Sequence, residues 1–153
     1  MAYIKILAVD YGDVRAGLAI SDALGMMANG IGTVKAKGMH DLCDIVIEHA
    51  TKNGAGKIVI GDPVNMNGTV GPRAEKCAQF AELLRTKVDV PVELWDERAT
   101  TVEAHNYLNE TNTRGKKRKA VVDAVAATII LESYLTYRQN MKAMEAKKQQ
   151  ESE

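Results

Sequence analysis

The chain lacks an excess of charge of either sign, because its 20 lysines and arginines match its 20 aspartates and glutamates. Without a global positive field, any attraction for a polyanion such as nucleic acid must come from a local basic patch. Aromatic residues are also few, at 5% of the sequence. Scarce stacking platforms argue against the reading of nucleic-acid bases one by one, and they favour recognition of backbone or shape.

Long hydrophobic runs are missing as well. No apolar stretch approaches the ~20 residues needed to span a bilayer, so we expect no membrane partner. The segment from Met1 to Lys5 leads almost directly into a strand-like run, without the apolar stretch and cleavage site of a signal peptide. These absences predict a cytoplasmic protein.

Cysteine is limited to Cys43 and Cys77, and neither belongs to a CxxC pair. Both lie in helix-like segments beside apolar residues, which indicates buried free thiols in a reducing compartment. The three histidines are not spaced as ligand pairs with either cysteine, and this argues against a zinc site.

The 153 residues suit one domain over 1–138, followed by a charged tail over 139–153 that we expect to fray. Residue patterns predict strands over 4–10, 15–21, 30–35, 57–60 and 90–95. They predict helices over 40–53, 72–87, 101–109 and 120–137, the last preceded by a basic turn over 114–119. A hairpin-rich start followed by βαβ alternation indicates an α/β fold, with a mixed sheet flanked by helices on both faces. Strand ends carry the chemistry in such sheets.

Three acidic residues far apart in the sequence stand in or beside apolar segments. Asp10 ends the first strand, Glu97 follows the last strand, and Asp123 lies inside an apolar helix. A carboxylate near a core is costly unless a cation compensates it. If the three converged, their oxygens would suit a hard divalent cation such as Mg²⁺. This pattern points to metal-assisted hydrolysis of a phosphodiester.

Each acid also has an ordinary structural explanation. The first can simply start the turn that follows it. Asp96 and Glu97 are neighbours and face opposite sides of a continuing strand, so the sequence does not decide which of them points to a metal. Asp123 can pair with Lys119 or Arg98.

Two further segments suit an anionic substrate. The loop over 61–73 is rich in glycine, asparagine and proline, and it precedes a helix N-terminus whose free N–H groups and dipole favour phosphate. The dense basic run over 114–119 precedes the helix with Asp123. Each is otherwise an ordinary surface loop or a solvated charged face. The candidate substrate-binding residues are Arg15, Asn65, Asn67, Arg73, Arg98, Lys116, Lys117, Arg118 and Lys119.

Four motifs occur in order along the chain, spanning about residues 4–137. They are LAVDYG with RAGLAISD (7–12 and 15–22), GDPVNMNG with GPRA (61–68 and 71–74), DER with TTVEA (96–98 and 100–104), and KRK (117–119) with Asp123 and 126–127. No single motif is specific, but the ordered set is. It resembles the YqgF family, also called RuvX, of ribonuclease H-like nucleases.

The resemblance implies a ribonuclease H-like fold with a mixed five-stranded sheet. It implies a metal-dependent nuclease related to Holliday junction resolvases, with a role in maturing the 5′ end of the small-subunit ribosomal RNA precursor. Asp10, Glu97 and Asp123 match the family's acidic triad and would hold two Mg²⁺ or Mn²⁺ ions. Two residues depart from the family pattern and add negative charge. Asp62 stands where an apolar or small residue is usual, and Asp13 stands where a neutral or basic one is usual.

Other functions compete with maturation of pre-16S rRNA. A Holliday junction resolvase would act on four-way DNA, and its two symmetric cuts favour a two-fold dimer, although both a monomer and a homodimer stay open. A non-catalytic RNA-binding module would use the basic run over 116–119 without metal-dependent cleavage. A sugar- or acetate-kinase-like phosphotransferase also opens with Asp-x-Gly on a hairpin, but it needs two lobes around ATP and this chain supplies one.

Overall fold

The computed structural model describes residues 4–63, 71–97 and 115–151, and within its last helix it describes the side chains of residues 125–148. Five strands form one sheet in the order β3-β2-β1-β4-β5. β2 runs antiparallel to β1 and β3, whereas β1, β4 and β5 are parallel. The strands are β1 (Lys5–Asp10), β2 (Arg15–Ser21), β3 (Ala28–Lys35), β4 (Ala55–Asp62) and β5 (Val92–Asp96). The predicted mixed five-stranded sheet is confirmed.

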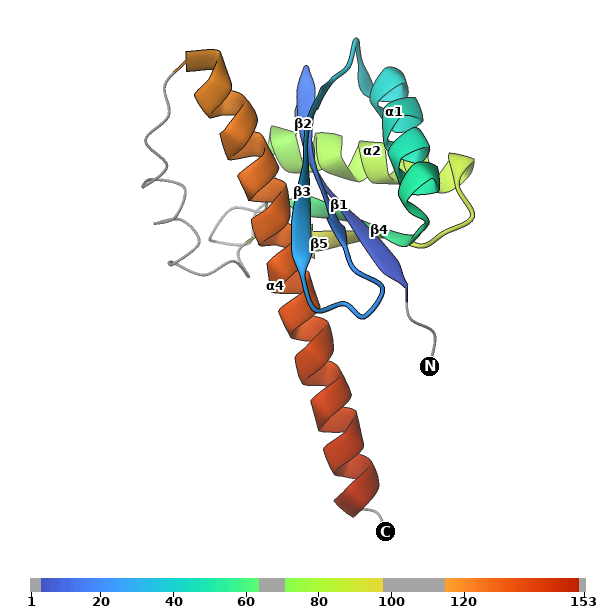
Figure 1. Cartoon of the computed structure of the whole chain (residues 1–153). Helices are drawn as coiled ribbons and strands as arrows, with labels where there is room; N and C mark the ends of the chain where they lie inside the picture. Colours follow the sequence, from blue (N-terminus) through green and yellow to red (C-terminus); the bar gives the residue numbers. More distant parts are fainter. Residues whose placement is uncertain (1–3, 64–70, 98–114, 152–153) are drawn as a thin grey trace.

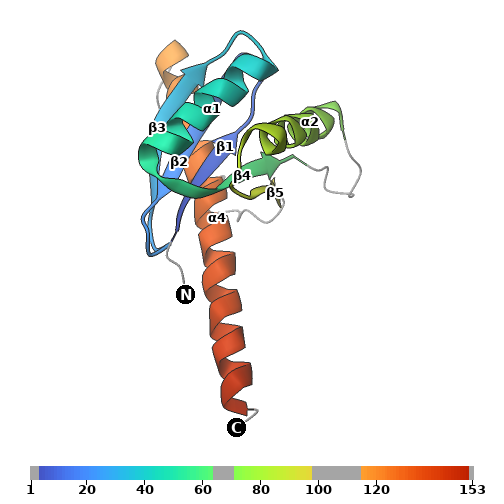
Figure 2. The same ribbon diagram turned by 90° about the vertical axis from the view of Figure 1, so that its right-hand side faces the viewer.

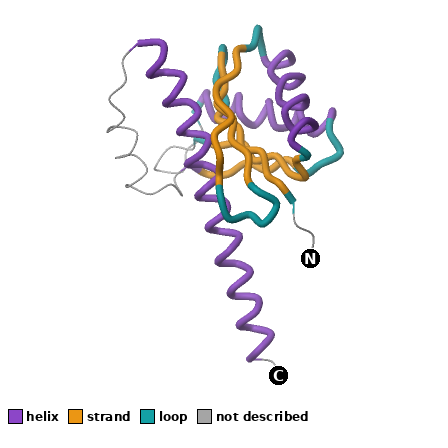
Figure 3. Tube along the Cα trace, in the orientation of Figure 1, coloured by secondary structure: helices purple, strands orange, loops and turns teal. Residues whose placement is uncertain are grey.

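Helices cover both faces of the sheet, as Figures 1 and 2 show. The helices are α1 (Met39–Asn53), α2 (Pro72–Lys87) and α4 (Gly115–Glu151). α1 and α2 cover one face, while α4 crosses the other and lies against β1, β2 and β3. The tube in Figure 3 shows the strands gathered between these two helical layers.

Strand alternation explains why there are two separate cores. Successive side chains of a strand point to opposite faces. Leu7 and Val9 of β1 therefore pack with α1 and α2, whereas Ile6 and Ala8 pack under α4 with Leu131 and its neighbours. Both cores are sealed, since all five of these side chains are fully buried.

The element boundaries agree closely with the sequence. The predicted strands and the helices near 40–53 and 72–87 are all present, with β3 and β4 starting two residues earlier than expected. Gly54 ends α1 in the left-handed conformation that glycine adopts without strain. Cys43 and Cys77 are buried free thiols, as predicted. The predicted helix over 101–109 lies outside the described residues.

The last helix is longer than predicted at both ends. The expected basic turn is already helical from Gly115, and the helix continues past Tyr137 to Glu151. Lysine, arginine, glutamate, glutamine, alanine and methionine dominate these extensions, and all are strong helix formers. Beyond residue 138 the described side chains are exposed, so local propensity rather than packing explains this part of the helix. The domain boundary at 138 stays a prediction.

None of the helices in the described ranges combines the length and the apolar character that a bilayer crossing requires.

Lys57, Glu93 and Tyr134, which we call the Lys57 cluster, tie α4 to β4 and β5. The Lys57 ammonium lies 2.6 Å from Glu93 Oε2, and it also donates to the Tyr134 hydroxyl. Tyr134 in turn donates to Glu93 at 3.0 Å. Burial alone would lower the pKa of Lys57, but hydrogen bonds to Glu93 and Tyr134 overcome this and raise it. Beside the cluster, Trp95 stacks edge-on against Tyr134 and donates its indole N–H to Ser133.

Candidate active site at the carboxyl ends of the parallel strands

Three parallel strands end at one edge of the sheet and bring distant acids together there. Val9 pairs with Ile60, so Asp10 follows at the same level as Gly61 on the neighbouring strand. Because Ile6 and Ala8 face α4, the alternation of β1 places Asp10 on that face too. The Asp10 side chain is only 12% exposed. A largely buried carboxylate at a strand end is the arrangement that the sequence predicted.

Glu97 comes directly after β5 and lies on the same face. A methyl group built on Gly61 would be 2.9 Å from Glu97 Oε1 and 2.6 Å from the Cδ1 atom of Ile130 in α4. The Glu97 carboxylate therefore rests over Gly61, under α4. The Glu97 carboxylate therefore lies on the face that Asp10 shares, and which of residues 96 and 97 points to a metal stays a prediction. Asp10 and Glu97, with Gly61 between them, are called the carboxylate site below.

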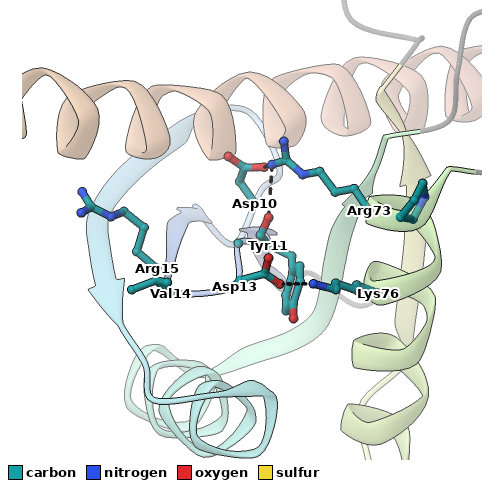
Figure 4. A pocket seen from close by; sticks show the side chains of 9 residues that line it. Asp10, Tyr11, Asp13, Val14, Arg15, Arg73 and Lys76 are labelled. Atoms are coloured by element: carbon teal, nitrogen blue, oxygen red, sulfur yellow. Dashed lines mark hydrogen bonds and ion pairs between the residues drawn. The ribbon is translucent and has the colours of Figure 1, made fainter.

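Arg73, near the start of α2, reaches Asp10. Its Nη2 atom lies 3.6 Å from Asp10 Oδ1 and donates to the Tyr11 carbonyl at 3.2 Å. Figure 4 shows the guanidinium lying beside the Asp10 carboxylate. The Arg73 side chain is 63% exposed, and a long ion pair with so exposed a partner contributes little stability. Arg73 therefore compensates Asp10 only weakly.

A cleft of about 680 Å³ opens beside Asp10. The turn from Tyr11 to Val14 forms one wall, and Arg73 with Lys76 of α2 forms another (Figure 4). Gly12 is needed in the turn, because a Cβ there would collide with the backbone carbonyl of Arg15. Cations at the walls and a carboxylate at the base suit a substrate with phosphate groups.

Asp13 pairs with Lys76, one of the three cations that line this cleft together with Arg15 and Arg73. Its carboxylate accepts from Lys76 Nζ at 3.0 Å, and both side chains are more than half exposed. Its charge is therefore partly matched by a lysine that the sequence analysis missed. The spacing of Arg73 and Lys76 along one helix was visible in the sequence, but the turn that they face was not.

The pKa of the Cys77 thiol depends on several acids at this edge of the sheet. Burial raises the pKa of this thiol to about 12, with Arg73 lowering it and the carboxylates of Glu97, Asp62 and Asp10 raising it. Asp10 and Asp62 end β1 and β4, and Glu97 follows β5, so acids from the ends of three strands act on one thiol. A thiol with so high a pKa stays protonated at neutral pH.

The remaining predicted site residues fall where the structure describes less. Asp123 lies on α4, but its side chain is outside the described part. The same holds for the basic run at the start of α4, Lys116, Lys117, Arg118 and Lys119. Asn65, Asn67 and Arg98 lie outside the described residues altogether. Arg15 borders the cleft on the far side of Asp10 from Arg73 (Figure 4), and its buried Nε atom has no hydrogen-bond partner among the described atoms.

The donor set fits a hard divalent cation. Asp10 and Glu97 offer carboxylate oxygens on one face, next to an open cleft, and such oxygens are the ligands that Mg²⁺ and Mn²⁺ prefer. Among the side chains that the structure describes, no group of three histidines, cysteines or acids is close enough to bind a metal. Asp123 is not among those side chains, so the predicted triad stays a prediction.

Comparison with known proteins agrees with this geometry. A family model described as "RuvX: Holliday junction resolvase" matches residues 4–137. A Halothermothrix orenii protein named "Putative pre-16S rRNA nuclease" is 44% identical over 137 residues, covering 90% of this chain and 98% of that protein. A Clostridium novyi protein of the same name is 44% identical over 131 residues, covering 86% and 97%. The structure of Thermus thermophilus RuvC matches with a TM-score of 0.55 at 13% identity, over 88% of this chain and 96% of that one.

The predicted ribonuclease H-like fold is confirmed, since RuvC-like resolvases have that fold and the sheet order and helical layers found here match it. The family match covers all four of the sequence motifs, and the relatives are similar over nearly their whole length. The resemblance noted from the sequence is thereby confirmed, and the chain belongs to the RuvX family of nucleases.

Proposed function

We propose that this protein is a metal-dependent nuclease that hydrolyses phosphodiester bonds at the 5′ end of pre-16S rRNA during ribosome biogenesis in the cytoplasm. The observation that carries the proposal is the carboxylate site itself. Two acids at the ends of separate strands lie on one face at the carboxyl edge of the sheet, beside a cleft walled by cations. The names of the relatives support the choice of substrate.

Asp10, Glu97 and Asp123 would hold two Mg²⁺ or Mn²⁺ ions. Asp123 precedes Ile130 by seven residues, which is two helical turns, so the two positions follow one stripe of α4. Ile130 is the residue of α4 that meets Gly61 at the carboxylate site. Bound ions of this kind supply an activated water and stabilise the leaving oxygen.

The cations of the chain would hold the substrate. Arg73 is exposed and only weakly tied to Asp10, so it is free to exchange that carboxylate for a phosphate once a metal neutralises Asp10. Arg15 and Lys76 line the same cleft and would contact neighbouring phosphates. Asn65, Asn67, Arg98 and the basic run Lys116, Lys117, Arg118 and Lys119 are proposed to extend this surface.

A second candidate substrate is the four-way DNA junction. The family description and the fold of RuvC favour it, and a junction resolvase would be expected to act as a homodimer. The third candidate, a non-catalytic RNA-binding module, predicts RNA binding without cleavage. The acids at the carboxylate site argue against it, because a module that only binds RNA gains nothing from negative charge beside its cleft.

The deciding experiment is cleavage of precursor rRNA and of four-way junction DNA side by side, with Mn²⁺, with Mg²⁺ and with a chelator. We expect metal-dependent shortening of the rRNA precursor and slower or no cutting of the junction. Asp10→Asn is the control, because it keeps the shape of the side chain and removes the charge. Equal cleavage by Asp10→Asn would overturn the carboxylate mechanism, and preferential cutting of the junction would change the substrate.

A further inference from the structure

Gly61 occupies the one position on β4 that separates the two acids of the carboxylate site. It is paired with Trp95 of β5 on one side and stands level with Asp10 of β1 on the other. Val59, two residues earlier on the same strand, packs under α4, so a side chain at position 61 would point towards α4 as well. Glycine therefore leaves a gap in the layer where the acids lie.

The reason for glycine here is space and not backbone conformation. The glycines with positive φ among the described residues are Gly25, Gly32 and Gly54, so Gly61 has a backbone that other residues adopt. A Cβ at Gly61 would lie 2.9 Å from Glu97 Oε1 and 3.3 Å from its carboxyl carbon. The first separation is too short for a carbon atom and the second is unusually tight, so the Glu97 carboxylate occupies part of the volume that a side chain would fill.

We propose that Gly61 is a positioning residue, whose missing side chain provides the seat that holds the Glu97 carboxylate next to Asp10. The inference rests on the proposed metal-dependent function. An alanine at position 61 would push the carboxylate of Glu97 away from the sheet and separate it from Asp10. The ligand pair would then open, and divalent ions would bind less tightly.

Ile130 provides a competing explanation that the experiment must remove. Its Cδ1 atom is 2.6 Å from the same Cβ position, and the side chain is only 2% exposed. Gly61→Ala would therefore also strain the packing of α4, which carries Asp123. Ile130→Val deletes the Cδ1 atom and relieves this contact, while the contact with Glu97 remains.

The test compares Gly61→Ala, Ile130→Val and the double variant, by thermal unfolding without metal and by calorimetric titration with Mn²⁺. We expect Gly61→Ala to lower both the unfolding temperature and the Mn²⁺ affinity. In the double variant the unfolding temperature should return to that of Ile130→Val, while the affinity stays weaker by about tenfold, as for other groups that orient metal ligands.

Gly56→Ala is the matched control on the same strand. Its Cβ would lie 3.0 Å from the side chain of Ile4, at the opposite end of β4 and away from the acids. It should cost stability and leave Mn²⁺ affinity unchanged. If the double variant binds Mn²⁺ as tightly as Ile130→Val, the seat is not the function of Gly61. If the wild-type protein itself binds no Mn²⁺, the proposed function fails and this inference fails with it, so the two failures are told apart by the wild-type titration.

Discussion

Two clusters of charged side chains lie on the face of the sheet that α4 covers, and they differ in the groups that they bring together. In the Lys57 cluster, one ammonium meets one carboxylate at 2.6 Å, and a tyrosine hydroxyl bonds to both. In the carboxylate site, Asp10 and Glu97 lie on either side of Gly61, and Arg73, which is mostly exposed, is 3.6 Å from Asp10.

The difference separates stability from binding. Matched, hydrogen-bonded charges under a helix hold that helix in place and need nothing further. Two neighbouring acids repel one another, and this repulsion is relieved when a cation binds between them. The Lys57 cluster therefore anchors α4, whereas the carboxylate site is where we propose that a metal binds.

Replacing Glu97 or Glu93 by glutamine, one at a time, should show the largest difference between the two clusters. Glu97→Gln removes a proposed metal ligand, so we expect the cleavage rate to fall by about 10³-fold, or about 4 kcal/mol in the barrier. The unfolding free energy of this variant should change little or rise, because one of two neighbouring negative charges is removed and their repulsion is lost. Cleavage kinetics with Mn²⁺ and urea unfolding without metal are the measurements.

Glu93→Gln is the matched variant for comparison with Glu97→Gln, because Glu93 lies on β5 and on the same face of the sheet. It leaves Lys57 with a neutral acceptor, and since Glu93 is 40% exposed we expect a loss of about 1 kcal/mol in unfolding free energy. Cleavage should stay within about twofold of the wild type at a temperature where both are folded. A variant that lost activity while keeping its stability would reverse the roles given to the two clusters.

Tyr134→Phe sharpens the role of the Lys57 cluster. The ring and its edge-on contact with Trp95 remain, but the hydroxyl that bridges Lys57 and Glu93 is lost. We expect a destabilisation of about 1 kcal/mol, measured by urea unfolding. An unchanged midpoint would mean that the hydroxyl bridge contributes nothing to holding α4.

The two buried thiols allow a test by pH. Burial raises the pKa of Cys43 to about 11 and of Cys77 to about 12, from an ordinary value of 9.0. Below pH 9 both thiols are protonated in the folded and unfolded chains. Above it the unfolded chain releases protons that the folded chain keeps, so stability falls as pH rises, by up to about 1.4 kcal/mol per pH unit for each thiol.

Urea unfolding between pH 8 and pH 10.5 measures this slope, and Cys77→Ala should flatten it. Cys43→Ala is the control, because burial is the main cause of its raised pKa and neither Asp10 nor Glu97 contributes to it. Equal slopes in the wild type and both variants would contradict the assigned pKa values.

The smallest effect is expected at the rim of the cleft. Asp13→Asn releases Lys76, so we expect substrate to bind about twofold tighter at low salt. Lys76→Ala should weaken binding by a similar factor and reduce the salt dependence of binding by about one unit of slope. Fluorescence anisotropy with labelled RNA over a range of salt concentrations is the measurement. Tighter binding by Lys76→Ala would rule out a contact between Lys76 and phosphate.

Much of the fold was predictable because local residue patterns indicate where the strands and helices begin and end. Short apolar runs indicated the strands, and Gly54 and Pro72 marked where α1 ends and α2 begins. The predicted ends of α4 were wrong because we interpreted its charged residues as a turn and a tail, although the same residues are good helix formers. The direction of Glu97 was out of reach, since it depends on where β5 stops and on the gap at Gly61, which only the pairing of β4 with β5 creates.

The continuity of α4 has a geometric consequence. One straight helix passes over both the Lys57 cluster and the carboxylate site, so Tyr134 and Asp123 cannot move independently. A slip of one residue where Tyr134 is held would turn the whole rod by about 100° and advance it by about 1.5 Å at every position. Only a change that let the helix slip at Tyr134 would then misalign the proposed third acid, even though no residue near the substrate had changed.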